Sequence, residues 1–169
     1  MKSKMVVASL VLPIRKIRKR WKVLFGIKAK KIAAGLWSPY GGKRKGRESM
    51  PKCALRETRE ECKLRGRLQN LKKVAVICGY FKVGKTYIKE WEVHTFILRK
   101  PRGRPKATKE MARPTWFPFT QLPLDRMLAG DREWVPRVLQ GETGKVRVFY
   151  SGGSTAKFDG FGFEPCSFE

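Results

Sequence analysis

The chain has 169 residues, 41% of them hydrophobic, which supports a folded core and excludes a disordered chain. Its 39 Lys and Arg against 14 Asp and Glu give a net charge of +25, which favours phosphate-bearing partners such as nucleotides or nucleic acids. A length of 169 residues is typical of one domain, which we expect over residues 1–169. No segment is apolar over the length needed to cross a bilayer, so we expect no membrane partner.

Two strands are predicted near the N-terminus, at residues 5–12 and 21–27, where aliphatic residues predominate and a basic turn lies between. The basic, then apolar start of the chain faintly resembles a signal peptide, but it lacks a convincing cleavage site. A first strand is therefore the better interpretation. Residues 28–43 are rich in Gly and small residues and are predicted to form a loop.

A helix is predicted to follow, with Ser49 as its N-cap, Pro51 in its first turn and an end near Lys63. The residues expected on its apolar side are Leu55, Thr58 and Cys62. Its acidic residues are therefore expected to project away from the core.

The second half of the chain alternates strands, loops and one helix. The predicted elements are strands at 71–83 and 87–100 around a hairpin at 83–86, a loop at 101–109, a strand at 114–119, a helix at about 131–139 and a closing hairpin at 145–164. The aromatic residues expected in the core are Trp37, Trp116 and Trp134. This mixture indicates an α/β fold.

Cysteine usage predicts reduced thiols. The four cysteines are Cys53, Cys62, Cys78 and Cys166, which form no C-x-x-C pair. His94 is the only histidine, so neither a zinc site nor a Cys–His nucleophile has enough partners. We therefore expect a reducing, cytoplasmic location.

Four of the scarce acids fall within residues 41–64, namely Glu48, Glu57, Glu60 and Glu61. The last three are spaced i, i+3 and i+4, so they would share one helical face and repel each other. Such a face is solvated in many proteins, but here it calls for neutralising cations, either nearby Arg and Lys or a metal. Carboxylates are hard oxygen ligands that suit Mg²⁺ or Mn²⁺.

The spacing of this stretch resembles a known motif. It runs from Gly42 through five residues to Glu48, then through seven residues to R-E-T-R-E-E-C-K-L, residues 56–64. This resembles the Nudix box, G-x5-E-x7-R-E-U-x-E-E-x-G-U, in which U is a bulky aliphatic residue. Thr58 replaces an aliphatic residue and Lys63 replaces the second glycine, but neither position is a metal ligand in the family pattern.

The resemblance implies a Nudix α/β/α sandwich, with a mixed sheet between helices, and a Mg²⁺- or Mn²⁺-dependent hydrolase of nucleoside di- or triphosphate linkages. The metal ligands that it implies are the carbonyl of Gly42 and the carboxylates of Glu57, Glu60 and Glu61. Glu48 would pair with Arg56 and brace the loop against the helix. The base would be one of the clustered glutamates or a further acid.

Other segments resemble the MutT-type oxidised-purine nucleoside triphosphatases of this superfamily. "KEMARPTWF" is similar to their E-M-R-P-x-W-F with one residue inserted, and "LFGIK", "GLWSPYGGK" and "GDREWVP" are further matches. This similarity implies that Glu110 is an extra metal ligand or base. It also implies that Lys28 and Lys43 bind phosphates and that Asp131 contacts the purine edge. Asp131 could equally cap a helix, and Glu110 could be an ordinary loop residue.

Three positions depart from the subgroup. Ser38 stands where a base-binding asparagine is common, Leu128 where a stacking tryptophan is expected, and Gly130 where the first of two aspartates lies. Each departure removes a contact with the base, so we expect shallow selectivity among purine triphosphates.

Residues 99–109, "RKPRGRPKATK", resemble an AT-hook, a minor-groove DNA-binding element centred on Arg-Gly-Arg between prolines. In that interpretation Arg102 and Arg104 would lie along an A·T-rich groove, and Gly103 would permit close approach. The alternative is a surface loop in a chain where basic residues are everywhere.

Two classes of function follow. The first is a metal-dependent nucleotide hydrolase, for which the glutamates of residues 57–61 are the discriminating feature. The second is a basic nucleic-acid-binding protein that retains the Nudix fold, for which the charge and residues 99–109 are the evidence. Both would be combined in an enzyme that acts on the 5′ end of RNA.

Overall fold

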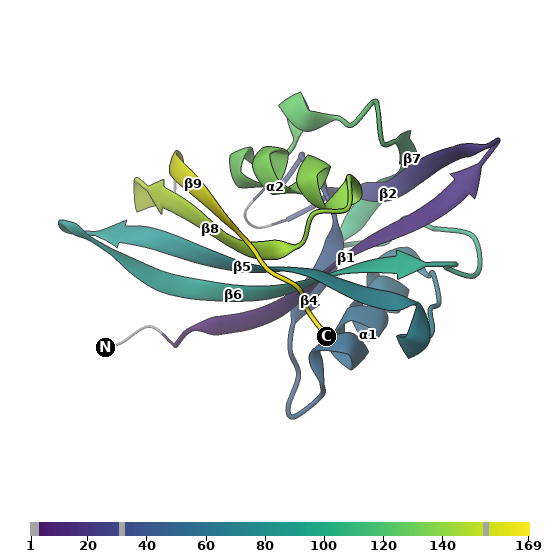
Figure 1. The fold of residues 1–169 in the computed structure, drawn as a ribbon, viewed down its shortest axis with the longest axis horizontal. Coiled ribbons are helices and arrows are strands. Elements are labelled where there is room, and N and C mark those ends of the chain that lie inside the picture. Colours follow the sequence, from purple (N-terminus) through teal and green to yellow (C-terminus); the bar gives the residue numbers. More distant parts are fainter. Residues whose placement is uncertain (1–3, 31–32, 154–155) are drawn as a thin grey trace.

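A computed structural model describes residues 4–30, 33–153 and 156–169, and in these it places a nine-stranded sheet between two α-helices (Figure 1). The strands are β1 (Val6–Ile17), β2 (Arg20–Lys28), β3 (Trp37–Ser38), β4 (Tyr40–Lys43), β5 (Leu71–Val83), β6 (Thr86–Arg99), β7 (Met111–Pro118), β8 (Gly144–Ser151) and β9 (Lys157–Pro165). The helices are α1 (Met50–Cys62), α2 (Ala129–Leu139) and the 3-10 turns η1 (Leu68–Asn70) and η2 (Leu124–Arg126).

The sheet is mixed. Its strands follow the order β3-β2-β1-β6-β5-β8-β9, while β4 pairs with β1 and β7 pairs with β2. The β1–β6 and β5–β8 pairs are parallel, and the other pairs are antiparallel. The predicted mixed sheet between helices is therefore confirmed.

Strand β1 organises the part of the sheet that matters for function. On one edge it pairs with β4 along residues 8–11 and with β2 along residues 14–17. The same strand is parallel to β6 along its other edge. This branching places the short glycine strand β4 directly beside α1, because both contact the first half of β1.

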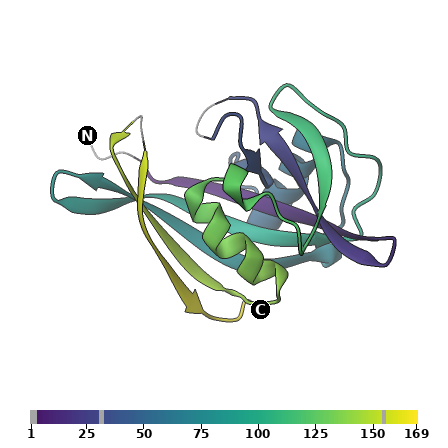
Figure 2. The same ribbon diagram turned by 90° about the horizontal axis from the view of Figure 1, so that it is seen from above.

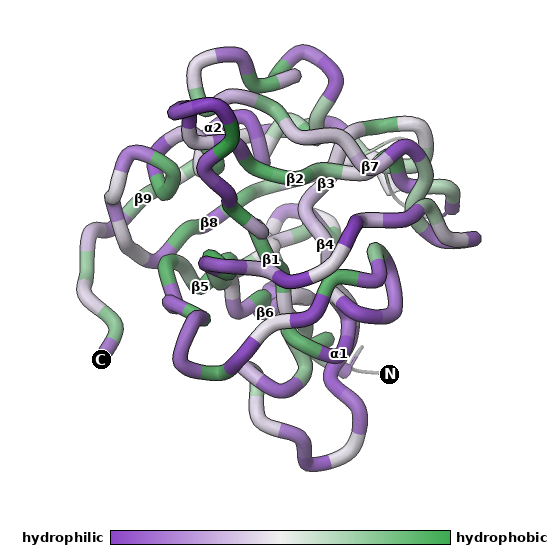
Figure 3. Tube along the Cα trace, turned by 90° about the vertical axis from the view of Figure 1, so that its right-hand side faces the viewer, coloured by the Kyte–Doolittle hydropathy of each residue, from purple (hydrophilic) through white to green (hydrophobic). Residues whose placement is uncertain are grey.

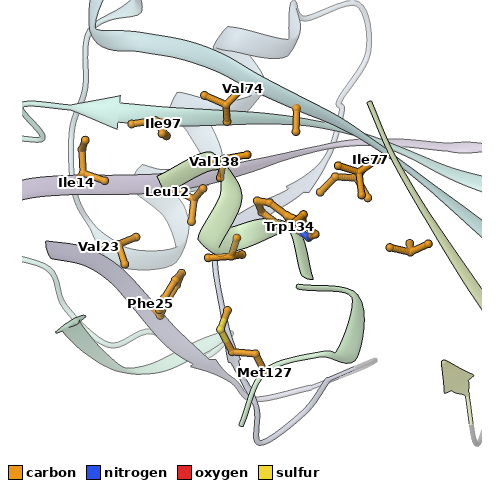
Figure 4. Packing of buried hydrophobic residues seen from close by; sticks show 14 residues of the cluster. Leu12, Ile14, Val23, Phe25, Val74, Ile77, Ile97, Met127, Trp134 and Val138 are labelled. Atoms are coloured by element: carbon orange, nitrogen blue, oxygen red, sulfur yellow. The ribbon is translucent and has the colours of Figure 1, made fainter. Parts of the chain in front are cut away.

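The two helices cover opposite faces of the sheet (Figures 1 and 2). Apolar residues concentrate in the central strands, whereas the loops are hydrophilic (Figure 3). Under α2, the fully buried Trp134 packs with Leu12, Phe25 and Met127 (Figure 4). On the other face Ala54 of α1 belongs to a second buried cluster. Burial of this apolar area is the main favourable term in folding.

Helix α1 begins and ends as its sequence predicts. The Ser49 hydroxyl accepts a hydrogen bond from the Lys52 N–H, Pro51 lies in the first turn, and Lys63 ends the helix. Lys63 has a φ of 65°, in the left-handed region where the Nudix box normally has glycine. The substitution therefore leaves the turn after the helix in place, at a modest conformational cost.

Two sequence predictions need correction. Residues 28–43 are not only a loop, because they contain strands β3 and β4, although residues 31–32 of this stretch lie outside the described part. Trp134 is in the core as expected, but Trp37 and Trp116 are only partly buried. Among the described residues, no helix has the length and apolar character required to cross a membrane.

Candidate active site

The acidic residues of α1 divide between two environments. Glu57 and Glu61 are only 7% and 5% exposed, whereas the Glu60 side chain is 45% exposed. The prediction that the acids project away from the core is therefore wrong for Glu57 and Glu61. The prediction placed only the apolar residues of α1 on its buried side. It failed because the glycine strand β4 leaves space for two carboxylates beside the helix.

The glycine pair of β4 provides that space. The Gly41 N–H donates a 2.8 Å hydrogen bond to Oε2 of Glu61. A Cβ atom on Gly42 would lie 2.6 Å from the Glu57 carboxylate carbon, and one on Gly41 would lie 1.9 Å from the Ser9 carbonyl oxygen. Any larger residue at either position would displace the carboxylate or the strand.

Arg56 connects the acidic cluster. Its guanidinium donates to Glu48 at 3.1 and 2.6 Å, to Glu57 at 2.7 Å and to Glu60 at 3.0 Å. The pair that the sequence predicted between Glu48 and Arg56 is therefore present in the structure. Arg56 also donates to the Lys43 carbonyl at 3.1 Å, so it braces the chain before α1 against the helix.

The pKa of Glu61 is strongly perturbed. Burial is the main cause that raises the pKa of Glu61 to about 8, and repulsion from Glu57 and Glu110 adds to it. The Gly41 hydrogen bond and the Lys28 ammonium oppose this shift. A buried carboxyl beside another carboxylate is a site where a bound cation would relieve electrostatic strain.

The side chains of the cluster provide part of the ligand set of a divalent ion. Within residues 4–30, 33–153 and 156–169, no three Asp, Glu, His or Cys side chains are grouped so that they could hold a metal ion by themselves. Two buried carboxylates beside the glycine strand nevertheless provide hard oxygen ligands, which suit Mg²⁺ or Mn²⁺ better than softer metals. Further oxygens would come from the Gly42 carbonyl, Glu60 or a substrate phosphate.

The lysine and acid predicted from outside the Nudix box lie around this cluster. Lys28 pairs with Met111 in the β2–β7 ladder, so it lies beside Glu110, and its ammonium opposes the rise in the pKa of both Glu61 and Asp131. Glu110 is exposed, and its charge contributes to the raised pKa of Glu61. Lys43 is also exposed, at the end of β4.

Asp131 lies in the first turn of α2 but does not cap the helix, because the N-cap residue is Leu128. Its Oδ1 accepts a 3.0 Å hydrogen bond from the indole N–H of Trp134. Burial raises the Asp131 pKa to about 6, and the hydrogen bond from Trp134 and the charge of Lys28 oppose this rise.

Ser38, the other predicted contact with the base, is buried. Its hydroxyl donates a 2.9 Å hydrogen bond to the Pro39 carbonyl, so this proton is not available to a substrate.

Sequence reasoning missed Tyr150. Its hydroxyl oxygen accepts a 3.2 Å hydrogen bond from the Gly130 N–H and keeps its own proton to donate. A Cβ atom on Gly130 would lie 2.8 Å from this oxygen, so the glycine is required by the tyrosine. This contact joins the start of α2 to β8, and no local pattern in the sequence indicates that these two elements are neighbours.

The Arg-Gly-Arg segment lies apart from these residues. Arg102, Gly103 and Arg104 are exposed, and the Arg102 backbone pairs with Arg65 through hydrogen bonds of 3.0 and 2.8 Å. The segment is therefore folded against the protein, and DNA contact by these three residues stays a prediction.

The ion pair between Glu48 and Arg56 should make the free energy of unfolding fall in acid. Hydrogen bonding to Arg56 is the main cause that lowers the pKa of Glu48 to about 2. Because the folded pKa is below the unfolded value, the stabilisation is present above about pH 4.5 and is lost as the pH falls towards 2. We expect Glu48→Gln to lower the free energy of unfolding at pH 7 by about 1 kcal/mol and to flatten its acid dependence.

Urea unfolding at several pH values measures this effect. Glu142→Gln is the matched control, since Glu142 pairs with Arg137 at 3.5 Å while both side chains are 44% exposed. Equal slopes of stability against pH for the wild type and Glu48→Gln would show that the pair contributes nothing.

A mixed sheet between two helices, with buried glutamates against a glycine strand, is the arrangement that the resemblance to the Nudix box implies. The chain belongs to the NUDIX domain family, whose model matches residues 5–138.

Individual relatives agree with this assignment. The chain is 35% identical over 119 residues to the oxidized purine nucleoside triphosphate hydrolase of Danio rerio. This match covers 70% of this chain and 72% of the relative. Among solved structures, the mMutator MutT protein from Bacillus halodurans superposes with a TM-score of 0.74 at 17% identity, covering 95% of this chain and 98% of that one.

A bifunctional NMN adenylyltransferase/ADP ribose pyrophosphatase from Francisella tularensis, in complex with AMP and a Mn ion, superposes with a TM-score of 0.63 at 16% identity. That match covers 82% of this chain and 42% of the other. The two structural similarities demonstrate the shared fold. The family match and the curated relative identify this chain as a Nudix hydrolase.

Proposed function

We propose that this Nudix hydrolase uses Mg²⁺ to split purine nucleoside triphosphates into the nucleoside monophosphate and pyrophosphate. The observation that carries the proposal is the pair of buried carboxylates of Glu57 and Glu61 against the glycine strand β4. The Lys28 ammonium acts electrostatically on both Glu61 and Asp131, which supports a substrate that spans from the acidic cluster to α2.

The proposed metal ligands are Gly42 through its carbonyl and Glu57, Glu60 and Glu61 through their carboxylates. When bound, the ion supplies charge neutralisation at the phosphates and lowers the pKa of a coordinated water molecule. Arg56 orients these carboxylates through its bonds to Glu57 and Glu60, and Glu48 holds Arg56 in place.

In the proposed reaction, a water oxygen bonds to a phosphorus of the triphosphate chain as the bond from that phosphorus to the bridging oxygen breaks. The leaving phosphate group takes the electron pair, and the water proton passes to a carboxylate. We assign the base to Glu110, whose exposed side chain lies near Glu61. Lys28 and Lys43 would bind the phosphate oxygens.

At the other end of the site, Asp131 would accept hydrogen bonds from the purine edge, and the buried Ser38 would line the pocket. Tyr150 supplies an additional hydroxyl beside Gly130, where the subgroup has an aspartate. The resemblance of this chain to oxidised-purine triphosphatases supports oxidised purine nucleotides as one substrate class. We still expect selectivity between purine triphosphates to stay within about tenfold.

We further infer that residues 1–169 act as one domain, because β8 pairs with β5 and α2 packs on the same sheet. A reducing cytoplasmic location suits the four free cysteines.

A nucleotide panel tests the proposed reaction. Purified protein with Mg²⁺ would be incubated with nucleoside triphosphates, their oxidised forms, ADP-ribose and 5′-triphosphate RNA, and the products identified by mass. We expect nucleoside monophosphate and pyrophosphate from the free purine triphosphates. Cleavage of ADP-ribose or RNA alone would contradict the proposed substrate, and release of inorganic phosphate would contradict the proposed bond.

Replacing Asp131 tests the proposed contact with the base. We expect Asp131→Asn to raise KM for purine triphosphates about tenfold with kcat nearly unchanged, because the contact binds substrate and transition state alike. Steady-state kinetics between pH 5 and 8 should show KM changing near pH 6 in the wild type, where the Asp131 carboxyl has its pKa, and no such change in the variant.

The exposed Asp125 of η2 provides the matched control, as Asp125→Asn changes charge equally without altering the pocket. A KM that Asp131→Asn leaves unaltered would remove Asp131 from the proposed pocket.

A further inference from the structure

Three strongly basic segments meet at one end of the molecule, which we call the basic end. Residues 15–22, 65–72 and 99–109 carry 15 Lys and Arg and no Asp or Glu. They meet because Nη2 of Arg15 donates to the carbonyls of Pro101 at 2.8 Å and Gly103 at 3.3 Å, while Arg65 pairs with Arg102. Figure 1 shows the β1–β2 turn at this end and the β5–β6 hairpin at the opposite end.

A cleft of about 210 Å³ lies within this basic end. It is lined by Arg65, Gly66, Arg67, Lys100 and Arg102. Across the described ranges, none of these four cations forms an ion pair. Four positive charges around one small concavity repel each other, so an anion bound there would lower the electrostatic free energy.

The main chain holds the cleft in shape and leaves its side chains available. The Arg65 N–H donates to the Arg102 carbonyl at 3.0 Å, and the Arg102 N–H donates to the Arg65 carbonyl at 2.8 Å. Both arginine side chains project from a fixed backbone, so less conformational freedom is lost on binding a ligand. Guanidinium groups match the oxygens of a phosphate with paired hydrogen bonds.

We propose that this basic end binds single-stranded nucleic acid, with the cleft holding phosphates of its backbone. The row of cations continues beyond the cleft along residues 99–109 and 15–22, which suits an extended polyanion better than a single small anion. Trp21 is 47% exposed and lines a second cavity together with Lys72 and Arg99, so it offers a surface at this end on which an unpaired base can stack.

This binding mode differs from an AT-hook. A hook lays an extended backbone along the minor groove, but here the Arg102 backbone is paired with Arg65 and the Gly103 carbonyl accepts from Arg15. The side chains of Arg102 and Arg104 are exposed and can contact a ligand. Contacts with phosphates are therefore favoured over insertion into a groove.

The cleft shares no residue with the proposed hydrolase site, although the segment 99–109 ends beside Glu110. This segment returns to α1 through the bond from the Thr108 hydroxyl to the Glu61 carbonyl at 2.9 Å, which involves backbone of the helix and not the carboxylate. The inference does not depend on the proposed reaction, so its test is independent of nucleotide hydrolysis.

A charge-matched pair of variants tests the cleft. Lys100→Gln with Arg102→Gln removes two charges from the cleft, and Lys82→Gln with Lys85→Gln removes two exposed charges from the β5–β6 hairpin. Fluorescence anisotropy would measure binding of a labelled single strand of about 20 nucleotides over a range of salt concentrations. We expect the cleft variant to bind at least tenfold more weakly, with a salt slope lower by about 1.4, and the hairpin variant to bind like the wild type.

Trp21→Ala separates nucleic acid from other polyanions. We expect it to weaken binding of the single strand about tenfold and to leave binding of inorganic polyphosphate unchanged, because polyphosphate has no base to stack. Thermal unfolding midpoints and nucleotide hydrolysis should remain at wild-type values in the Lys100/Arg102 variant. Those controls show that the fold and the hydrolase site are intact.

Several results would overturn the proposal. Equal weakening in the cleft and hairpin variants would mean that only the overall charge binds. Tighter binding to a duplex than to the single strand, or a preference for A·T-rich duplex, would favour groove recognition instead. Binding to anionic lipid vesicles in preference to the single strand would assign the basic end to a membrane surface.

Discussion

Glu61→Gln and Glu60→Gln are each expected to lower kcat for nucleotide hydrolysis about a thousandfold in Mg²⁺, since each removes a charged metal ligand while keeping its shape. The two variants should differ in stability. Glu61 is buried with a pKa of about 8, so replacing it with a neutral amide should stabilise the protein at pH 8, where the carboxyl is partly ionised. Glu60 is nearly half exposed, so its replacement should have little effect on stability.

A variant that loses activity while its stability stays equal or rises cannot have lost activity by misfolding. Steady-state kinetics and urea unfolding would be measured on the same protein samples. Glu133→Gln, on the exposed side of α2, is the matched control and should be fully active. Full activity in both cluster variants would rule out the proposed metal ligands.

Gly42→Ala is expected to lower kcat at least a hundredfold, although it adds only one methyl group. The new Cβ would lie 2.6 Å from the Glu57 carboxylate, which must then move away from β4. A displaced ligand costs several kcal/mol of transition-state stabilisation, so the variant should behave like the loss of Glu57 itself. Mg²⁺ titrations of the hydrolysis rate should show a weaker apparent affinity for the ion.

Gly162→Ala in β9 provides the control, because its Cβ would meet only the Cβ of Arg147 at 3.9 Å, an ordinary contact. Its kcat should equal that of the wild type. Activity of Gly42→Ala within a factor of about two of the wild type would show that Glu57 does not need its position against the glycine strand.

Much of the fold could be predicted because local signals agreed. Ser49 and Pro51 start α1, the alternation of residues 71–83 produces β5, and the basic turn separates β1 from β2. The short strands β3 and β4 could not be predicted, since each depends on pairing with β2 or β1 and has almost no local preference of its own.

The members of the acidic cluster could be predicted from the sequence, but the environment of each carboxylate could not. The spacing of the glutamates identified the residues of the cluster, yet their burial depends on the absence of side chains at Gly41 and Gly42, which lie on another element. Tyr150 reaches Gly130 only after β8 joins the sheet beside β5. Contacts between residues distant in sequence are set by topology, so periodicity and propensity do not reveal them.

The central claim is that Glu57 and Glu61 hold the divalent ion that the reaction requires. Electron paramagnetic resonance of Mn²⁺, titrated into the protein with a non-hydrolysable nucleoside triphosphate, tests it without relying on turnover. We predict that the wild type binds Mn²⁺ and that the double variant Glu57→Gln with Glu61→Gln loses this binding at the same concentrations. Equal Mn²⁺ binding by the wild type and the double variant would contradict the account.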